Sequence, residues 1–181
     1  MVLDLLRKRR SIREFKAQPL TAGEIDILTE TLLRSPSSRG RNPWEFIFVT
    51  DPELRGRLGQ AKAHGAEFLR KAPLAVAVVA DTDKCDVWIE DCSIAAILVQ
   101  MAAESLGLGS CWAQMRLRNH KDGRSSQEHL KEILQLPEGY QVLAVIGIGH
   151  PAESKTGHRR EDLLWNKIHR ERFVLVEEPA P

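Results

Sequence analysis

Two apolar runs, Leu74-Ala-Val-Ala-Val-Val-Ala80 and Gln141-Val-Leu-Ala-Val-Ile-Gly147, decide the fold of this chain. Each run is short and rich in small and β-branched residues, and Pro73 and Gly139 punctuate the chain just before them. An apolar run without polar alternation predicts a strand that is buried on both faces of a sheet. We therefore expect a central sheet whose two faces are both covered.

Further strands and several helices are expected around these two runs. Strands are predicted at Trp44–Val49 and Ser110–Ala113. Two helices begin at capping boxes, Thr21-Ala-Gly-Glu24 and Ser125-Ser-Gln-Glu128. The full set of helices is predicted at residues 2–8, from 21, from 52, at 87–106, at 125–135 and at 163–168. For a chain of 181 residues, this order predicts one α+β domain with a few core strands flanked by helices.

Composition and charge exclude several classes of function. The net charge is only +1, so no overall field attracts nucleic acid or an anionic membrane. The most apolar window, residues 94–103, is far shorter than the ~20 residues needed to span a bilayer. The three cysteines lack CxxC spacing and favour reduced thiols in a soluble, cytoplasmic protein. The six histidines form no HExxH pair or carboxylate triad, so no metal site is expected.

The helix that contains residues 94–103 is apolar almost all round, because Gln100 is its only polar residue in that window. One interpretation is a central core helix. The other is a helix shared between two subunits, which buries its second face against a partner. The sequence leaves both interpretations open.

Two basic clusters lie far apart in the chain. In Arg9-Arg10-Ser11-Ile12-Arg13, extended backbone would send Arg9, Ser11 and Arg13 to one side. Guanidinium groups and a hydroxyl suit a phosphate dianion. The second cluster is Lys155-Thr-Gly-His-Arg-Arg160. The clusters either converge on one phosphate or are two solvated basic segments.

Two further segments have the composition of ligand-binding loops. Ser35-Pro-Ser-Ser-Arg-Gly-Arg-Asn-Pro-Trp44 offers several hydrogen-bond donors just before a predicted strand. Gly107-Leu-Gly-Ser-Cys-Trp-Ala-Gln-Met115 has small residues that allow a flat ring to approach the backbone. The alternatives are an ordinary connection for the first segment and a helix end at Gly107 for the second.

Taken in order and spacing, these four segments resemble the nitroreductase family of FMN-dependent, NAD(P)H-using oxidoreductases. The likeness runs from about Leu3 to Arg172 and is strongest to compact members with few insertions. It implies a single α+β domain over residues 1–173, with a central, mostly antiparallel sheet. It also implies a homodimer with FMN at the subunit interface. The acidic, proline-containing end of the sequence independently predicts a mobile tail at residues 174–181.

The resemblance assigns cofactor-binding roles to residues in each segment. Arg9, Arg10 and Ser11 would hold the FMN phosphate and ribityl chain, and Arg13 would be the electrostatic partner of the N1–C2=O edge of the flavin. The partner subunit would supply a loop in which this chain has Gly40 and Asn42 where many members have Asn and Gln. The remaining implied contacts are Pro36, Ser37, Ser38 and Asn42 from that loop, Gln114 and Met115 near flavin N5 through a backbone donor, and Lys155, His158 and Arg160 at the phosphate.

The resemblance also implies a mechanism. FMN would take hydride from NAD(P)H at N5 and pass electrons to a nitroaromatic, quinone or similar electron-poor small molecule by ping-pong kinetics. No catalytic side chain is then required, in agreement with the lack of a nucleophile–base motif. Dehydrogenation and reductive dehalogenation are alternatives within the family. A flavin-binding protein without turnover is another alternative, whereas the composition disfavours nucleic-acid binding.

Overall fold

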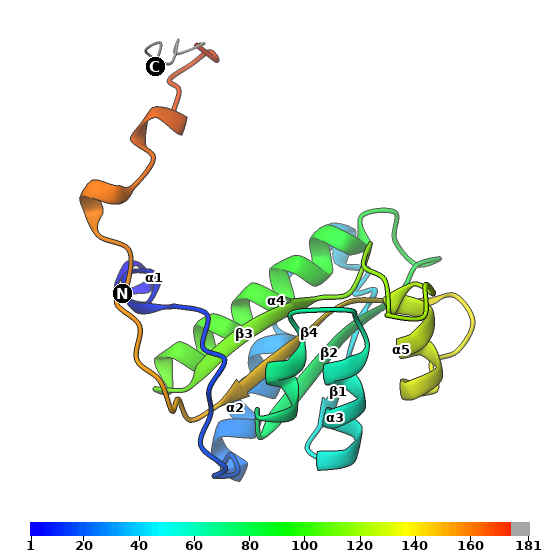
Figure 1. The fold of residues 1–181 in the computed structure, drawn as a ribbon. Coiled ribbons are helices and arrows are strands. Elements are labelled where there is room, and N and C mark those ends of the chain that lie inside the picture. The colour runs from blue at the N-terminus through cyan, green and yellow to red at the C-terminus, as the bar shows by residue number, and fades with distance from the viewer. Residues whose placement is uncertain (175–181) are drawn as a thin grey trace.

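The computed structural model describes residues 1–174, in which a four-stranded sheet forms the centre of the molecule (Figure 1). The strands are β1 (Trp44–Val49), β2 (Leu74–Asp81), β3 (Gly109–Gln114) and β4 (Tyr140–Gly149). Their order in the sheet is β1-β2-β4-β3, and every neighbouring pair is antiparallel. The expected α+β fold with an antiparallel sheet is confirmed.

Five α-helices surround the sheet. They are α1 (Val2–Lys8), α2 (Ala22–Leu33), α3 (Pro52–Gln60), α4 (Trp88–Ser105) and α5 (Ser126–Leu134). Both predicted capping boxes form, at Thr21 before α2 and at Ser125 before α5. Local sequence therefore sets where these two helices begin.

The two faces of the sheet have separate hydrophobic cores. Along β2, Ala75, Ala77 and Val79 face the core that includes residues of α3 and α5. The alternate residues, Val76 and Val78, face the core that includes residues of α2 and α4. All of these β2 side chains are essentially inaccessible to solvent. The apolar run at Leu74–Ala80 is thus a strand buried on both faces, as predicted.

Helix α4 is buried on one side only. Ala95, Val99 and Ala103 are fully buried against the sheet, whereas Ile94 and Ile97 on the opposite side are each 40% exposed. Within one chain, α4 is therefore not covered all round. Over residues 1–174, no helix combines the length and apolar content needed to cross a membrane.

The last described segment, residues 158–174, leaves the body of the molecule, and we call it the arm (Figure 1). The predicted helix at residues 163–168 is wrong, since the arm contains only two short 3₁₀ turns, Arg160–Asp162 and Trp165–Lys167. A single turn is costly to nucleate and needs a packing surface. Here Leu164, Trp165 and Ile168 are all exposed.

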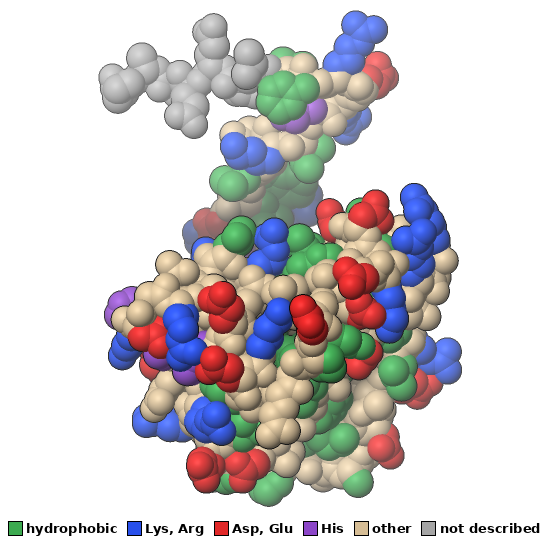
Figure 2. All heavy atoms as spheres, turned by 90° about the vertical axis from the view of Figure 1, so that its right-hand side faces the viewer, with side chains coloured by type: hydrophobic (Ala, Val, Ile, Leu, Met, Phe, Trp, Pro, Cys, Tyr) green, Lys and Arg blue, Asp and Glu red, His purple; other side chains and the backbone are tan. Residues whose placement is uncertain are grey.

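A space-filling view separates the arm from the body and shows acidic and basic side chains interspersed over the body's visible face (Figure 2). This mixture agrees with the net charge of +1. Apart from Val174, the predicted tail at residues 174–181 lies outside the described residues.

Candidate functional site

The first basic segment, Arg9–Arg13, lies between the edge of the sheet and the second basic segment. Ser11 forms a parallel bridge with Ser110 at the start of β3, and the Ile12 N–H donates to the Ser110 carbonyl at 3.0 Å. Gly109 permits this approach, because a Cβ atom there would come within 2.8 Å of the Ile12 side chain. Gly109, the first residue of β3, therefore has a packing role that brings a basic segment to the sheet edge.

The two basic clusters lie next to each other, while their shared binding of one phosphate stays a prediction. The Lys155 ammonium donates to the Ser11 carbonyl at 2.9 Å, and the Arg10 guanidinium donates to the Thr156 carbonyl. A cavity of about 170 Å³ lies between the clusters, and its lining includes Lys8, Arg10, Gly107 and Lys155. The lining also includes the carboxylates of Glu104 and Glu153, so the three cationic side chains leave one net positive charge for an anionic group such as phosphate.

Glu153, which the sequence did not single out, ties these segments together. Its Oε1 accepts hydrogen bonds from the Arg13 N–H at 2.5 Å, the Glu14 N–H at 3.2 Å and the Lys155 ammonium at 2.9 Å. The Arg13 N–H, followed by the Lys155 ammonium, lowers the pKa of Glu153 to about 2. The carboxylate is therefore charged at neutral pH and fixes the backbone of the first cluster to the second.

A further cation that sequence reasoning missed, Lys62, lies near Arg13. Burial lowers the pKa of Lys62, and the positive charges of Arg118 and Arg13 lower it further. Burial raises the pKa of the Cys111 thiol on β3, and Arg13, Lys155 and Lys62 all oppose that rise. The site thus gathers positive charge around the β3 edge, where no single stretch of sequence would indicate it.

The end of β3 has one backbone donor that is already used and one that faces outward. The Met115 N–H donates to the Leu143 carbonyl at 3.1 Å. Because donors alternate in direction along an antiparallel strand, the Gln114 N–H is directed to the outer edge of β3, which is an edge strand. The Gln114 side chain is occupied locally, since it bonds Trp112 and the Arg116 carbonyl. Of the two predicted residues, Gln114 is the one whose amide can meet a ligand.

The predicted loop at residues 36–42 is held by a buried carboxylate at the start of α4. Asp91 is 3% exposed, and its Oδ1 accepts the Ser38 N–H at 2.9 Å. Within the loop, the Ser37 hydroxyl lies 2.7 Å from the Asn42 side-chain oxygen and accepts the Asn42 N–H at 2.9 Å. Pro36 precedes this closed turn. The sequence did not reveal the role of Asp91, because only the fold places it beside the loop.

The loop and the cationic cavity lie at opposite ends of α4. Asp91 is in the first turn of the helix, whereas Glu104 and Gly107, at its other end, line the cavity. A helix of 18 residues is about 27 Å long at 1.5 Å per residue. Within one chain, therefore, the loop does not reach the cavity.

The last two predicted residues lie where the chain enters the arm. The His158 side chain is exposed, and the Arg160 guanidinium lies over the Trp165 ring at 4.7 Å from its centroid. Arg160 also accepts the Trp165 indole N–H through its carbonyl at 3.1 Å. In this chain Arg160 is thus engaged within the arm, away from the cavity formed by Arg10 and Lys155.

The chain belongs to the nitroreductase family, whose family model matches residues 6–67 and 60–150. Among solved structures, it is similar to an FMN-dependent nitroreductase from Clostridium difficile R20291, with 41% identity, a TM-score of 0.92, and coverage of 94% of this chain and 99% of the other.

Two curated relatives extend the comparison. A protein of Archaeoglobus fulgidus, provisionally named NADH dehydrogenase/NAD(P)H nitroreductase, is 30% identical over 176 residues, which cover 94% of this chain and 98% of that protein. The FMN reductase (NADPH) of Bacillus subtilis is 30% identical over 170 residues, which cover 83% of this chain and 66% of that protein. The family resemblance inferred from the sequence is therefore confirmed.

Proposed function

We propose that this protein is an FMN-dependent oxidoreductase that takes electrons from NAD(P)H and passes them to an electron-poor small molecule such as a nitroaromatic or a quinone. The observation that carries the proposal is the convergence of two basic segments, through the Lys155–Ser11 and Arg10–Thr156 contacts, beside the open edge of β3. Family membership supports the same reaction class.

The charge of the residues present supports FMN binding. The cavity lined by Arg10 and Lys155 suits the phosphate, and Arg9 and Ser11 lie on the same segment. The Gln114 N–H is the donor that we assign to the reactive edge of the ring. When bound, FMN supplies hydride acceptance and electron release, which no side chain of the chain can provide.

The protein's own contribution is positive charge and orientation. Arg13 and Lys62 supply fixed positive charge beside β3, which favours a ligand that gains electrons there. Glu153 holds the Arg13 backbone in place through its N–H. These residues would hold and orient the cofactor, and we propose ping-pong kinetics in which donor and acceptor would bind in turn at the same place.

We further propose that the active form is a homodimer. Two copies of α4 packed antiparallel through the exposed Ile94 and Ile97 side would bring the Asp91 end of one helix to the cavity end of the other. The loop at residues 36–42 of one subunit would then complete the cavity of its partner. The exposed apolar residues of the arm, such as Trp165, would also gain a surface to pack against.

All three cysteines are free thiols and are buried. Because disulfides are rare in the cytoplasm, these free thiols support a cytoplasmic location, which we include in the proposal. A dehydrogenase or dehalogenase of the same family, or a flavin carrier without turnover, would be built on the same site. No feature of the described residues favours these over a reductase, so the experiment must separate them.

The test is a visible absorbance spectrum of the purified protein, followed by anaerobic addition of NADH or NADPH and then of a quinone or nitroaromatic. We expect a flavin spectrum that a nicotinamide bleaches and an electron-poor acceptor restores. A yellow protein that neither nicotinamide bleaches would instead be a carrier. A colourless protein that takes up no added FMN would refute the proposal.

A further inference from the structure

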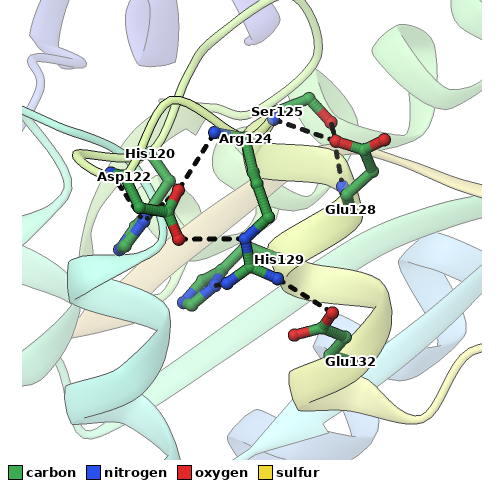
Figure 3. A network of polar contacts seen from close by, with 7 residues as sticks. All are labelled: His120, Asp122, Arg124, Ser125, Glu128, His129 and Glu132. Atoms are coloured by element: carbon green, nitrogen blue, oxygen red, sulfur yellow. Dashed lines mark hydrogen bonds and ion pairs between the residues drawn. The ribbon is translucent and has the colours of Figure 1, made fainter.

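A turn and the helix after it bring two histidines and a carboxylate together outside the site described above (Figure 3). His120 and Asp122 lie on the turn, and His129 lies on α5. One ligand atom from each residue lies within 4.8 Å of the others. The two imidazole rings are stacked, with centroids 4.1 Å apart. We call these three residues the His–Asp–His cluster.

Backbone bonds hold the turn in a fixed shape. The His120 N–H donates to the Arg124 carbonyl at 2.9 Å, and the Gly123 N–H donates to the His120 carbonyl at 3.1 Å. Gly123 has a φ of +91°, a conformation that favours glycine. The Ser125 capping box then fixes the direction in which α5 begins. The cluster is thus carried by a rigid support.

The cluster already surrounds a positive charge, the guanidinium of Arg124. Its Nε donates to Asp122 Oδ2 at 2.9 Å, its Nη2 lies 3.2 Å from His129 Nδ1, and its Nη1 donates to Glu132 Oε1 at 2.9 Å. Because a guanidinium group can only donate hydrogen bonds, the Nδ1 atom of His129 that faces it carries a lone pair.

His120 and Asp122 are also in direct contact. His120 Nδ1 lies 2.9 Å from Asp122 Oδ1, while the Asp122 N–H is directed at the same nitrogen at 3.3 Å. With a proton on Nδ1, His120 donates a hydrogen bond to the Asp122 carboxylate, and a metal ion would take the place of that proton between the two atoms.

We propose that His120, Asp122 and His129 bind a divalent transition-metal ion of the Zn²⁺ class, and that Arg124 holds the cation position when the metal is absent. Zn²⁺ binds imidazole nitrogen and carboxylate oxygen at about 2.0–2.2 Å, which places tetrahedral ligands roughly 3.4 Å apart. Side-chain rotations bring the cluster to that spacing, and water takes the fourth position. Arg124 keeps Glu132 as its partner when it moves aside.

This proposal departs from the sequence expectation of no metal site, and it does not rest on the proposed redox function. Residues 120, 122 and 129 match no metal-binding motif, and only the turn and the first turns of α5 bring them together. The test therefore needs neither FMN turnover nor a substrate.

The experiment is isothermal titration of ZnCl₂ into the untagged holoprotein, with the same titration of variants. We expect one tight site per chain. His129→Ala and Asp122→Asn should weaken binding at least tenfold, because each removes a ligand. Arg124→Gln should tighten binding several-fold, because it removes the competing cation. His169→Ala, which removes a histidine from the arm, is the control and should leave Zn²⁺ affinity unchanged.

Equal Zn²⁺ affinity in the wild-type protein and in His129→Ala would show an adventitious surface ion only and overturn the proposal. If His129→Ala does not fold, the Asp122→Asn and Arg124→Gln variants still test the proposal. The proposal requires the Zn²⁺ affinity to fall in the first variant and to rise in the second. As a second measurement, Zn²⁺ should raise the thermal unfolding temperature of the wild-type protein but not that of Asp122→Asn.

Discussion

The two ends of α4 carry two halves of the proposed site that are built in different ways. At the C-terminal end, segments more than a hundred residues apart are joined by charged contacts, such as Lys155 to the Ser11 carbonyl. At the N-terminal end, a short loop is fixed by one buried carboxylate, Asp91. The first half is suited to a charged group and the second to backbone contacts. In the proposed homodimer, the two halves would meet because opposite ends of two α4 helices lie together.

The largest expected effect comes from separating the two halves. Ile97→Glu places a charge on the exposed side of α4, and burying an unpaired charge in an interface costs about 3 kcal/mol or more. We expect a monomer by light scattering and FMN affinity lowered on the order of 100-fold. Arg57→Glu on α3, across the sheet, is the control and should remain a dimer. A monomeric Ile97→Glu that still binds FMN normally would show that one chain suffices.

The next effect tests the charged half by itself. Arg10→Ala removes a charge-assisted hydrogen-bond donor from the cavity, a loss of about 1.5–3 kcal/mol. We expect FMN to bind roughly 10- to 100-fold more weakly in a fluorescence titration. Riboflavin, which lacks the phosphate, should be almost unaffected. Arg70→Ala, an exposed arginine elsewhere, is the matched control. An equal loss for FMN and riboflavin would contradict the phosphate assignment.

Much of the fold was predictable because local sequence specifies it. The apolar runs predict β2 and β4, and the capping boxes predict the starts of α2 and α5. The predicted helix at residues 163–168 failed because a short segment needs a surface to pack against, and the arm has none within its own chain. Pattern alone predicts an element correctly where the residues of that element carry the signal themselves, as a continuous apolar run or a capping box does.

The site was less predictable, because its supporting residues act through long-range contacts. Arg10 and Lys155 belong to visible basic clusters, whereas Glu153, Lys62 and Asp91 look like ordinary surface or helix residues in the sequence. Glu153 meets the Arg13 N–H 140 residues away, and Asp91 meets the Ser38 N–H 53 residues away. Such contacts follow from the fold and leave no local pattern.

A smaller effect tests the loop half. Asp91→Ala leaves the Ser38 N–H without its buried acceptor, a cost of about 1–3 kcal/mol. We expect roughly tenfold weaker binding of both FMN and riboflavin, in contrast to Arg10→Ala. Asp91→Asn keeps a side-chain oxygen for Ser38 and should restore most of the affinity. Loss of FMN binding alone, with riboflavin unchanged, would place the loop at the phosphate and remove the distinction between the halves.

The smallest effect is a pH-dependent one at Glu153. Its pKa of about 2 in the folded protein lies below the ordinary value of 4.5. The folded state therefore prefers the charged carboxylate, and its stabilisation is fully present above pH 4.5 and is lost as the pH falls toward 2. Glu153→Gln should unfold about 2–4 °C earlier than the wild-type protein at pH 6. That difference should shrink steadily between pH 4.5 and pH 3 in thermal unfolding followed by circular dichroism. A difference that stays constant over this range would mean that the contacts to Arg13 and Lys155 do not depend on the charge of Glu153, and that the cationic half is held together by its shape alone.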